Sequence, residues 1–311
     1  MRSPLRGAVV STAALAVLVS AAACGDSDDS SAAGSSADSG VLDVVASTNV
    51  WGDIAATIGG DQVDVTSLIN DPSADPHSFE ASTRTQLAIS EADLVIENGG
   101  GYDDFMDTLL SSQDTDATVL NAVDISGHQD EADAAGEEFN EHVWYDFQAV
   151  KKVADQVESA LSDADSEHAD AFAANNAAFQ GQLDGLISSE ATDKTAVAGA
   201  GVAITEPVPG YLLDALGADN RTPAEFSEAI EEGDDVSPAV LQDTLDLFST
   251  GQVKALVYNE QTTGAETERV LEAARDNGVA VVPVTETLPD GKDYISWMTA
   301  NLDAVSKALS S

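Results

Sequence analysis

The sequence predicts an α/β protein of two lobes, each built on a parallel sheet, which are joined by one long helix. Strand-like apolar runs alternate with helical segments along most of the 311 residues, and this alternation indicates βαβ units. Without its ends the chain has about 270 residues, which fits two lobes rather than one small domain. Between the lobes, five residues at three- and four-residue spacing, all apolar except one asparagine, form one helical stripe. The stripe consists of Phe172, Asn176, Phe179, Leu183 and Leu186.

The N-terminal lobe is expected to span residues 43–165. Its predicted strands are 41–47, 63–69, 93–97 and 117–120, and its predicted helices are 50–58, 83–90, 103–111 and 147–161. The stretch 127–141 is predicted to be an exposed loop, because it is polar and acidic.

The connecting helix is placed at 166–190, and its length of on the order of 30 Å would traverse both lobes. The C-terminal lobe, 191–311, is predicted to repeat the alternation of strands and helices. Its strands are placed at 195–200, 252–258 and 279–282, and its helices at 208–216, 238–248, 265–276 and 294–309. Ligands of such folds bind beyond the carboxyl ends of the strands.

The first 23 residues are typical of a secretory signal, with Arg2 and Arg6 before an apolar run at 8–19. That run is too short for a comfortable membrane span. The following Cys24 is the only cysteine of the chain, which excludes an intrachain disulfide, and its setting resembles a bacterial lipobox. We therefore expect lipidation of Cys24; the alternative is an ordinary secreted protein with an incidental cysteine.

The segment 24–42 is rich in Ser, Ala, Asp and Gly and has little apolar surface to bury. Such a composition predicts a disordered tether after the lipid anchor. Anchor and tether together predict an extracytoplasmic protein held at the outer face of the cell membrane.

The chain carries 56 acidic and 12 basic residues, a formal net charge of −44. This balance excludes nucleic-acid binding, which requires a basic surface. Two explanations of the acidity remain: collection of metal cations, or a solvated surface suited to high salt. We favour the second, because self-repulsion of this size destabilises a compact state unless salt screens it.

Four segments at strand ends or helix starts carry residues that could bind a metal: His77, His142, Glu206 and Glu286. Neutral imidazole supplies nitrogen and a carboxylate supplies oxygen, a donor set that suits a divalent transition metal. Pro76 directs its neighbour away from helical geometry and so constrains the backbone beside His77. Each residue alone has an ordinary structural explanation, such as a loop contact, a satisfied buried histidine or a helix start.

From about residue 41 onward the chain resembles the zinc- or manganese-binding substrate-binding lipoproteins of ABC transporters. The resemblance rests on motifs in family order, which are 45–54 (VASTNVWGDI), 75–82 (DPHSFEAS), 90–95 (SEADLV), 142–144 (HVW), 210–212 (GYL) and the helix with Asn301 and Leu302. It implies two α/β lobes, a rigid connecting helix and one metal ion in the cleft between the lobes.

The resemblance also implies a ligand set. The first two family positions fall on His77 and His142, the third on Glu206 and the fourth, usually Asp, on Glu286. The implied cargo is Mn²⁺ or Zn²⁺, with Fe²⁺ not excluded, and the implied partner is an ABC permease. The implied protein is a monomer that meets the membrane only through its lipid anchor. A histidine in the third position and a histidine-rich loop, both typical of zinc-binding members, are missing, which favours manganese.

Two other classes of function are compatible with a surface metal site: a metallohydrolase and an adhesin that shares the fold. No nucleophile motif and no HExxH helix supports the hydrolase, so we predict that the protein is not an enzyme. Glu260, at the end of a predicted strand, is a candidate to face the cleft and accept a hydrogen bond from a metal ligand without binding the metal itself. His128, with Asp130 and Glu131, forms either an auxiliary cation site or a solvated charge run.

Overall fold

The computed structural model describes residues 40–71, 77, 79–112, 115–136 and 138–311. Residues Gly40–Ser311 form one compact unit. The predicted signal segment, the lipidation site Cys24 and most of the tether lie outside the described residues, as do the two residues before His77. Within the described part of the chain, no helix is both long and apolar enough to cross a bilayer.

The N-terminal lobe contains a parallel sheet in the strand order β2-β1-β3-β4. In the pairing of β1 with its two neighbours, Val44 lies opposite Val65 on one side and Leu94 on the other. Its elements are β1 (Leu42–Thr48), α1 (Asn49–Gly59), η1 (Gly60–Gln62), β2 (Val63–Ile69), α2 (Thr83–Glu91), β3 (Leu94–Glu97), α3 (Asp104–Ser111), β4 (Thr118–Asn121), α4 (Ala122–Ser126), α5 (His128–Ala135), η3 (Val143–Tyr145) and α6 (Phe147–Ala164).

The C-terminal lobe repeats this topology, because its parallel sheet has the order β6-β5-β7-β8. In both sheets the first strand along the chain lies between the second and the third. Such a reversal of strand order opens a crevice at the carboxyl ends of the strands. The elements are β5 (Gly201–Ile204), α8 (Gly210–Leu216), β6 (Asp219–Asn220), α9 (Ala224–Glu231), α10 (Pro238–Ser249), β7 (Ala255–Asn259), α11 (Ala265–Asp276), β8 (Ala280–Val284) and α12 (Tyr294–Leu309).

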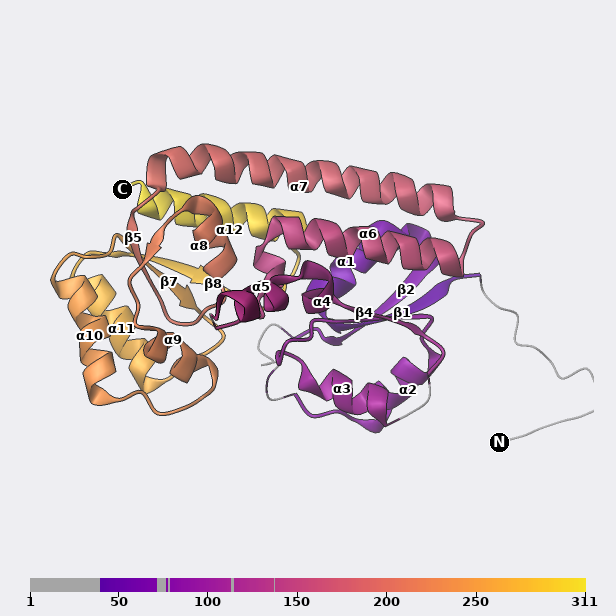
Figure 1. The fold of residues 1–311 in the computed structure, drawn as a ribbon, viewed down its shortest axis with the longest axis horizontal. Helices are drawn as coiled ribbons and strands as arrows, with labels where there is room; N and C mark the ends of the chain where they lie inside the picture. The colour runs from indigo at the N-terminus through magenta and orange to yellow at the C-terminus, as the bar shows by residue number, and fades with distance from the viewer. Residues whose placement is uncertain (1–39, 72–76, 78, 113–114, 137) are drawn as a thin grey trace, which may run out of the picture. The chain divides into compact units, whose positions relative to one another are not determined.

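A single long helix, α7 (Ala169–Val197), runs along both lobes (Figure 1). The residues it buries include every member of the predicted stripe, and it continues past residue 190 to Val197. The helix packs against α1 and α6 of one lobe and against α8 and α12 of the other. The predicted fold class, two parallel sheets joined by a long helix, is therefore confirmed.

Three local predictions are wrong. The stretch 127–141 is not only loop, because it contains α5, a helix that buries none of its residues and therefore leaves no apolar period in the sequence. The predicted strand 195–200 is instead the end of α7 and a turn, and β5 begins at Gly201. Finally, no element is predicted at 122–126 or between 216 and 238, where the structure has α4, β6 and α9.

One hydrophobic core connects the lobes. It includes Ile54 and Trp144 from the N-terminal lobe, Phe179 of α7, and Val202 and Trp297 from the C-terminal half. Because interiors pack at the density of organic crystals, a shared core resists large rotations of one lobe against the other. Two smaller clusters fill the outer sides of the two sheets.

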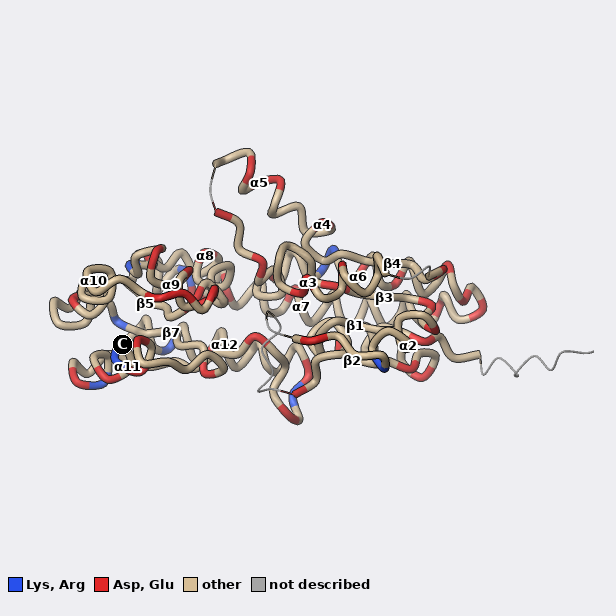
Figure 2. The backbone as a smooth tube through the Cα atoms, turned by 90° about the horizontal axis from the view of Figure 1, so that it is seen from below, with Lys and Arg blue, Asp and Glu red and all other residues tan. Residues whose placement is uncertain are grey.

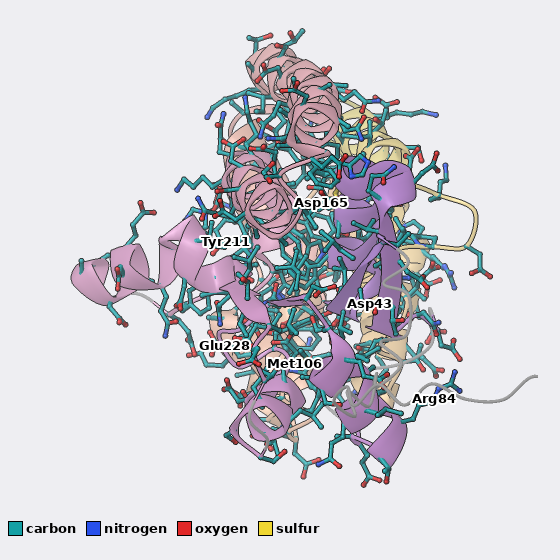
Figure 3. All side chains as sticks on the ribbon, turned by 90° about the vertical axis from the view of Figure 1, so that its right-hand side faces the viewer. Asp43, Arg84, Met106, Asp165, Tyr211 and Glu228 are labelled. Carbon is teal, nitrogen blue, oxygen red and sulfur yellow. The ribbon has the colours of Figure 1, made fainter. Side chains whose placement is uncertain are left out.

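Acidic residues are spread over the helices and turns of both lobes, with few basic residues among them (Figure 2). Side chains with oxygen at their tips surround the periphery of the molecule (Figure 3). The acidity is therefore a general property of the described surface and is not confined to one face.

Candidate metal centre

The four candidate ligands lie where the fold predicts a ligand site, near the carboxyl ends of strands. His77 follows β2, Glu206 follows β5 by two residues, and Glu286 follows β8 by two residues. His142 directly precedes η3. Each lobe therefore supplies two of the four side chains.

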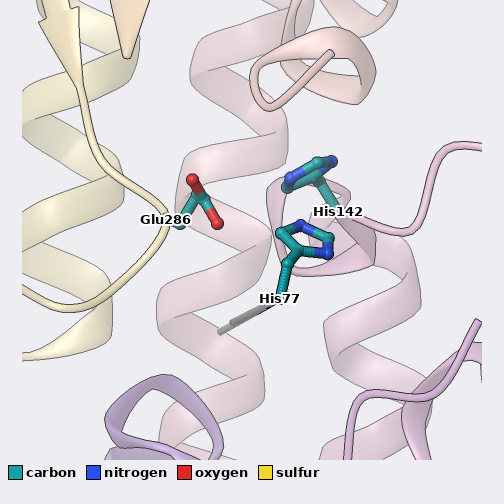
Figure 4. A group of neighbouring side chains, drawn as sticks. All are labelled: His77, His142 and Glu286. Carbon is teal, nitrogen blue, oxygen red and sulfur yellow. The ribbon is translucent and has the colours of Figure 1, made fainter. Parts of the chain in front are cut away.

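Three of these residues come together in space. The ligand atoms of His77, His142 and Glu286 all lie within 4.8 Å of one another. In Figure 4 both imidazole rings and the carboxylate point toward a common space, with Glu286 on the loop after β8. We call this group the inner cluster. His142 is fully buried and Glu286 nearly so, whereas His77 is exposed.

The spacing of the inner cluster fits a divalent transition metal. Metal–ligand distances of about 2.0–2.2 Å hold the donors of a tetrahedral ion roughly 3.3–3.6 Å apart. Ligand atoms that lie within 4.8 Å of one another therefore need to approach by at most about 1.5 Å to share an ion. Two nitrogens and one oxygen are a donor set for zinc or manganese rather than for calcium.

Asn140 orients the His142 ring. The Oδ1 atom of Asn140 lies 2.8 Å from His142 Nδ1 and also accepts the His142 backbone N–H at 3.1 Å. Since an amide oxygen only accepts, Nδ1 carries the proton and Nε2 keeps its lone pair. Burial, followed by the charge of His77, lowers the pKa of His142 well below its usual value and so favours the neutral, metal-binding form.

The same asparagine contacts the other lobe. Its Nδ2 donates to the carbonyl of Pro207, next to Glu206, at 3.1 Å, and its own carbonyl accepts from Tyr211 Oη at 2.6 Å. Gly210 makes room for this contact, since a Cβ at that position would lie 2.5 Å from Asn140 Nδ2. Asn140 therefore links the His142 side of the cleft to the loop that carries Glu206.

Aromatic rings enclose the two histidines. Tyr102 lies edge-on to His77 and to His142, with ring centroids 5.1 and 5.8 Å away, and Trp144 lies 5.1 Å from His142. Tyr102 and Trp144 are almost completely buried. Such an apolar wall excludes water and strengthens the attraction between carboxylates and a cation.

Glu286 is held by Asn259, the last residue of β7, and by Gln261, two residues further on. Asn259 Nδ2 donates to Glu286 Oε1 at 2.7 Å, and Gln261 Oε1 accepts the Glu286 backbone N–H at 2.5 Å. Glu260, the residue predicted for a supporting role, is exposed instead. The sequence analysis missed Asn259 and Gln261.

Glu206 is buried, with 3% of its surface exposed, but it belongs to neither of the two potential metal-binding groups found among the described residues. Its charge still acts on the cleft, because it is one of the carboxylates that raise the pKa of Glu231. Glu206 thus acts on Glu231 but does not converge with the ligand atoms of the inner cluster in this structure.

Two further glutamates lie in the cleft and were missed as site residues. Glu141 and Glu231 form a second group with His77, whose ligand atoms again lie within 4.8 Å of one another. We call this group the outer cluster. Glu231 Oε1 also lies 3.2 Å from His142 Nε2. In the sequence, the helix that carries Glu231 is indicated by Phe226 and Ile230, four residues apart, a signal too weak to define a helical period.

The glutamates crowd negative charge into a partly buried space. Burial, together with the charges of Glu141, Glu206 and Glu286, raises the pKa of Glu231 to about 10. Burial is also the main cause that raises the pKa of Glu141. Like charges that are removed from water are costly, and a bound cation offsets that cost. The cleft is therefore suited to a divalent cation.

His128 lies apart from both clusters. Its Nε2 is 2.7 Å from Asp146 Oδ2, its Nδ1 is 3.1 Å from Glu131 Oε2, and its ring stacks on Tyr211 at 4.6 Å between centroids. Both ring nitrogens thus contact carboxylates. This arrangement is an ion-pair network that fastens α5 to the start of α6.

Two α/β lobes with a nitrogen–oxygen site in the cleft between them define a solute-binding protein of the two-lobe type. A model of the family described as zinc-uptake complex component A, periplasmic (ZnuA), matches residues 44–308, and the chain belongs to this family. Its members are metal-binding substrate-binding proteins of transport systems and not enzymes.

Individual relatives agree with this assignment. The chain is 25% identical over 281 residues to the manganese-binding lipoprotein MntA of Bacillus subtilis, covering 86% of this chain and 90% of the relative. Among solved structures, it is similar to the periplasmic zinc-binding protein TroA from Treponema pallidum, with a TM-score of 0.73, 20% identity and coverage of 88% and 100%. The Ni²⁺ complex of FpvC from Pseudomonas aeruginosa gives a TM-score of 0.70, 22% identity and coverage of 86% and 97%. The structural likenesses establish the fold.

Proposed function

We propose that this protein captures a divalent transition metal outside the cytoplasm and delivers it to an ABC permease for import. The observation that carries the proposal is the inner cluster, in which imidazoles of one lobe and a carboxylate of the other lie within 4.8 Å of one another. Membership of a metal-uptake family supports it. In this proposal His77, His142, Glu206 and Glu286 bind the ion, and Cys24 carries the lipid anchor.

Mn²⁺ is the proposed cargo, with Zn²⁺ as the competing ion. Glutamates outnumber histidines in the cleft, and hard oxygen donors suit manganese. Intrinsic affinity for nitrogen and oxygen sites still favours zinc. Selection of manganese would therefore depend on coordination number, which bidentate glutamates can raise. Elemental analysis of protein purified from its own host, followed by competition between Mn²⁺ and Zn²⁺, tests this choice.

Release of the ion is proposed to follow a small displacement of Glu206. The loop that carries Glu286 is held against the N-terminal lobe by three hydrogen bonds. Tyr145 Oη donates to the Thr285 carbonyl at 2.8 Å. Asn49 Nδ2 donates to the Leu288 carbonyl, and Asn49 Oδ1 accepts from the Leu288 backbone N–H, both at 2.9 Å. Glu206 lies outside the inner cluster and can join or leave the ion with less rearrangement.

The test is metal affinity measured by isothermal titration calorimetry. His142→Ala and Glu286→Gln should each weaken Mn²⁺ binding by at least ~100-fold, because loss of an outer hydrogen-bond partner alone typically costs ~10–100-fold. Glu260→Gln removes the same charge from an exposed position nearby and should leave affinity within about threefold. Unchanged affinity in either ligand variant would exclude that residue from the site.

A further inference from the structure

The cleft contains a second convergence of ligand atoms beside the inner cluster. His77, Glu141 and Glu231 of the outer cluster meet the same 4.8 Å criterion as the inner one, and His77 belongs to both. The two groups are therefore adjacent and share one imidazole, that of His77.

All three residues of the outer cluster line an open cavity, whereas His142 and Glu286 of the inner cluster do not. A cavity of about 560 Å³ opens in the cleft, and His77, Glu141 and Glu231 all line it. Among the described lining residues, His142 and Glu286 do not occur. A cation that diffuses in from solvent thus reaches the outer cluster first.

A separate contact connects the two clusters. Glu231 Oε1 lies 3.2 Å from His142 Nε2, and both atoms are buried without a hydrogen bond of acceptable geometry. The His142 side chain is fully buried and that of Glu231 is 12% exposed. Since Nδ1 of His142 is engaged by Asn140, the nitrogen available to a metal is the one aimed at Glu231.

We infer that His77, Glu141 and Glu231 form an outer divalent-cation position at the mouth of the cleft, from which the ion passes to His142 and Glu286 while His77 stays bound. This inference rests on the proposed function, because the inner cluster is the destination. The two positions are occupied in turn. During transfer the ion exchanges Glu141 for Glu286, and Glu231 for the His142 nitrogen that Glu231 contacts, so the number of its ligands stays the same.

The rate of Mn²⁺ association tests the outer position. Stopped-flow tryptophan fluorescence is a suitable readout, because Trp144 packs 5.1 Å from His142. Glu141→Gln and Glu231→Gln should slow association at least fivefold. Glu232→Gln is the matched control, since it makes the same substitution at the adjacent residue, which lines the same cavity, and it should change the rate less than twofold. Equal slowing in all three variants would show only that the acidic cleft attracts cations in general, and it would overturn the inference.

An equilibrium measurement separates this inference from the proposed function. The His142→Ala variant disables the inner position and should retain weak Mn²⁺ binding, observed by the loss of free-ion EPR signal. Adding Glu141→Gln should lower that residual affinity at least tenfold, whereas adding Glu232→Gln should not. Residual Mn²⁺ binding that does not depend on Glu141 would overturn the inference of an outer position. No Mn²⁺ or Zn²⁺ binding by the unmodified protein would overturn the proposed function itself.

Discussion

At the scale of single residues, Asn140 has two separable tasks. Its oxygen fixes the His142 ring, and its amide nitrogen contacts the Pro207 carbonyl of the other lobe. Neither contact could be predicted from sequence, because they join residues 2 and 67 positions apart through a side chain that no motif marks. The histidines themselves could be predicted, since their motifs are specific.

Replacing Asn140 should separate the two tasks. Asn140→Ala removes both contacts and should weaken Mn²⁺ binding by ~10–100-fold, as for other supporting partners of metal ligands. Asn140→Asp keeps the acceptor for His142 Nδ1 and loses only the donor to Pro207, so it should lose less affinity. Titration calorimetry of both variants measures the difference. Asn175→Ala is the control, because Asn175 bonds the carbonyl of Ile58 far from the cleft; equal losses for Ala and Asp would contradict the ring-orienting role.

At the scale of elements, two of the three α-helices that were not predicted, α5 and α9, show what sequence patterns leave out. The α5 helix buries no residue, so its only signals are Ala, Glu and Gln propensity and flanking glycines at positive φ. The α9 helix is eight residues long and follows Pro223, and two apolar residues one turn apart are too little to define a period. Missing α9 meant missing Glu231. Long elements such as α11 and α12 have residue bounds that match their predictions.

The contact between α5 and α6 should depend on pH. The hydrogen bond to Asp146 raises the pKa of His128. Burial alone would raise the pKa of Asp146, but His128 and the backbone N–H of Gln148 lower it overall. The histidine contribution is fully present below pH 6.5 and is lost as pH rises through the raised pKa. The aspartate contribution is present above pH 3.8 and is lost as pH falls through the lowered pKa.

The His128→Gln variant should therefore lower the melting temperature most between about pH 4 and 6.5. The expected loss at pH 6 is roughly 2–4 °C, which corresponds to a partly exposed ion pair in a protein of this size. Differential scanning calorimetry at pH 6 and pH 9 measures it. A deficit of equal size at both values would show that the histidine acts through packing on Tyr211 and not through its charge.

At the scale of the whole molecule, opposing features determine stability. The shared core and α7 tie the lobes together, and contacts such as Tyr294 Oη to the Trp144 carbonyl at 2.6 Å fasten α12 to the N-terminal lobe. The net charge of −44 opposes these contacts, because repulsion between like charges destabilises the compact state. The two-lobe architecture could be predicted because alternation and length are global properties. The relative distances of the four ligands could not, because they depend on how the lobes pack.

Salt should stabilise the protein. Raising KCl from low to molar concentration screens repulsion between carboxylates on the described surface, since the Debye length falls to about 3 Å at 1 M. We expect the melting temperature to rise by about 5–10 °C, a few kcal/mol for a protein of this size. Sucrose of equal osmolality is the control for non-ionic effects. A flat response to KCl would remove the high-salt explanation of the acidity.

The central claim is that one cation joins nitrogens of the N-terminal lobe to a carboxylate of the C-terminal lobe. Anomalous diffraction at the manganese absorption edge, from crystals grown with Mn²⁺, tests it most directly. The account predicts the strongest peak roughly 2.0–2.3 Å from ring nitrogens of His77 and His142 and from a Glu286 oxygen. A strongest peak elsewhere on the molecule, with these three side chains unbound, would contradict it.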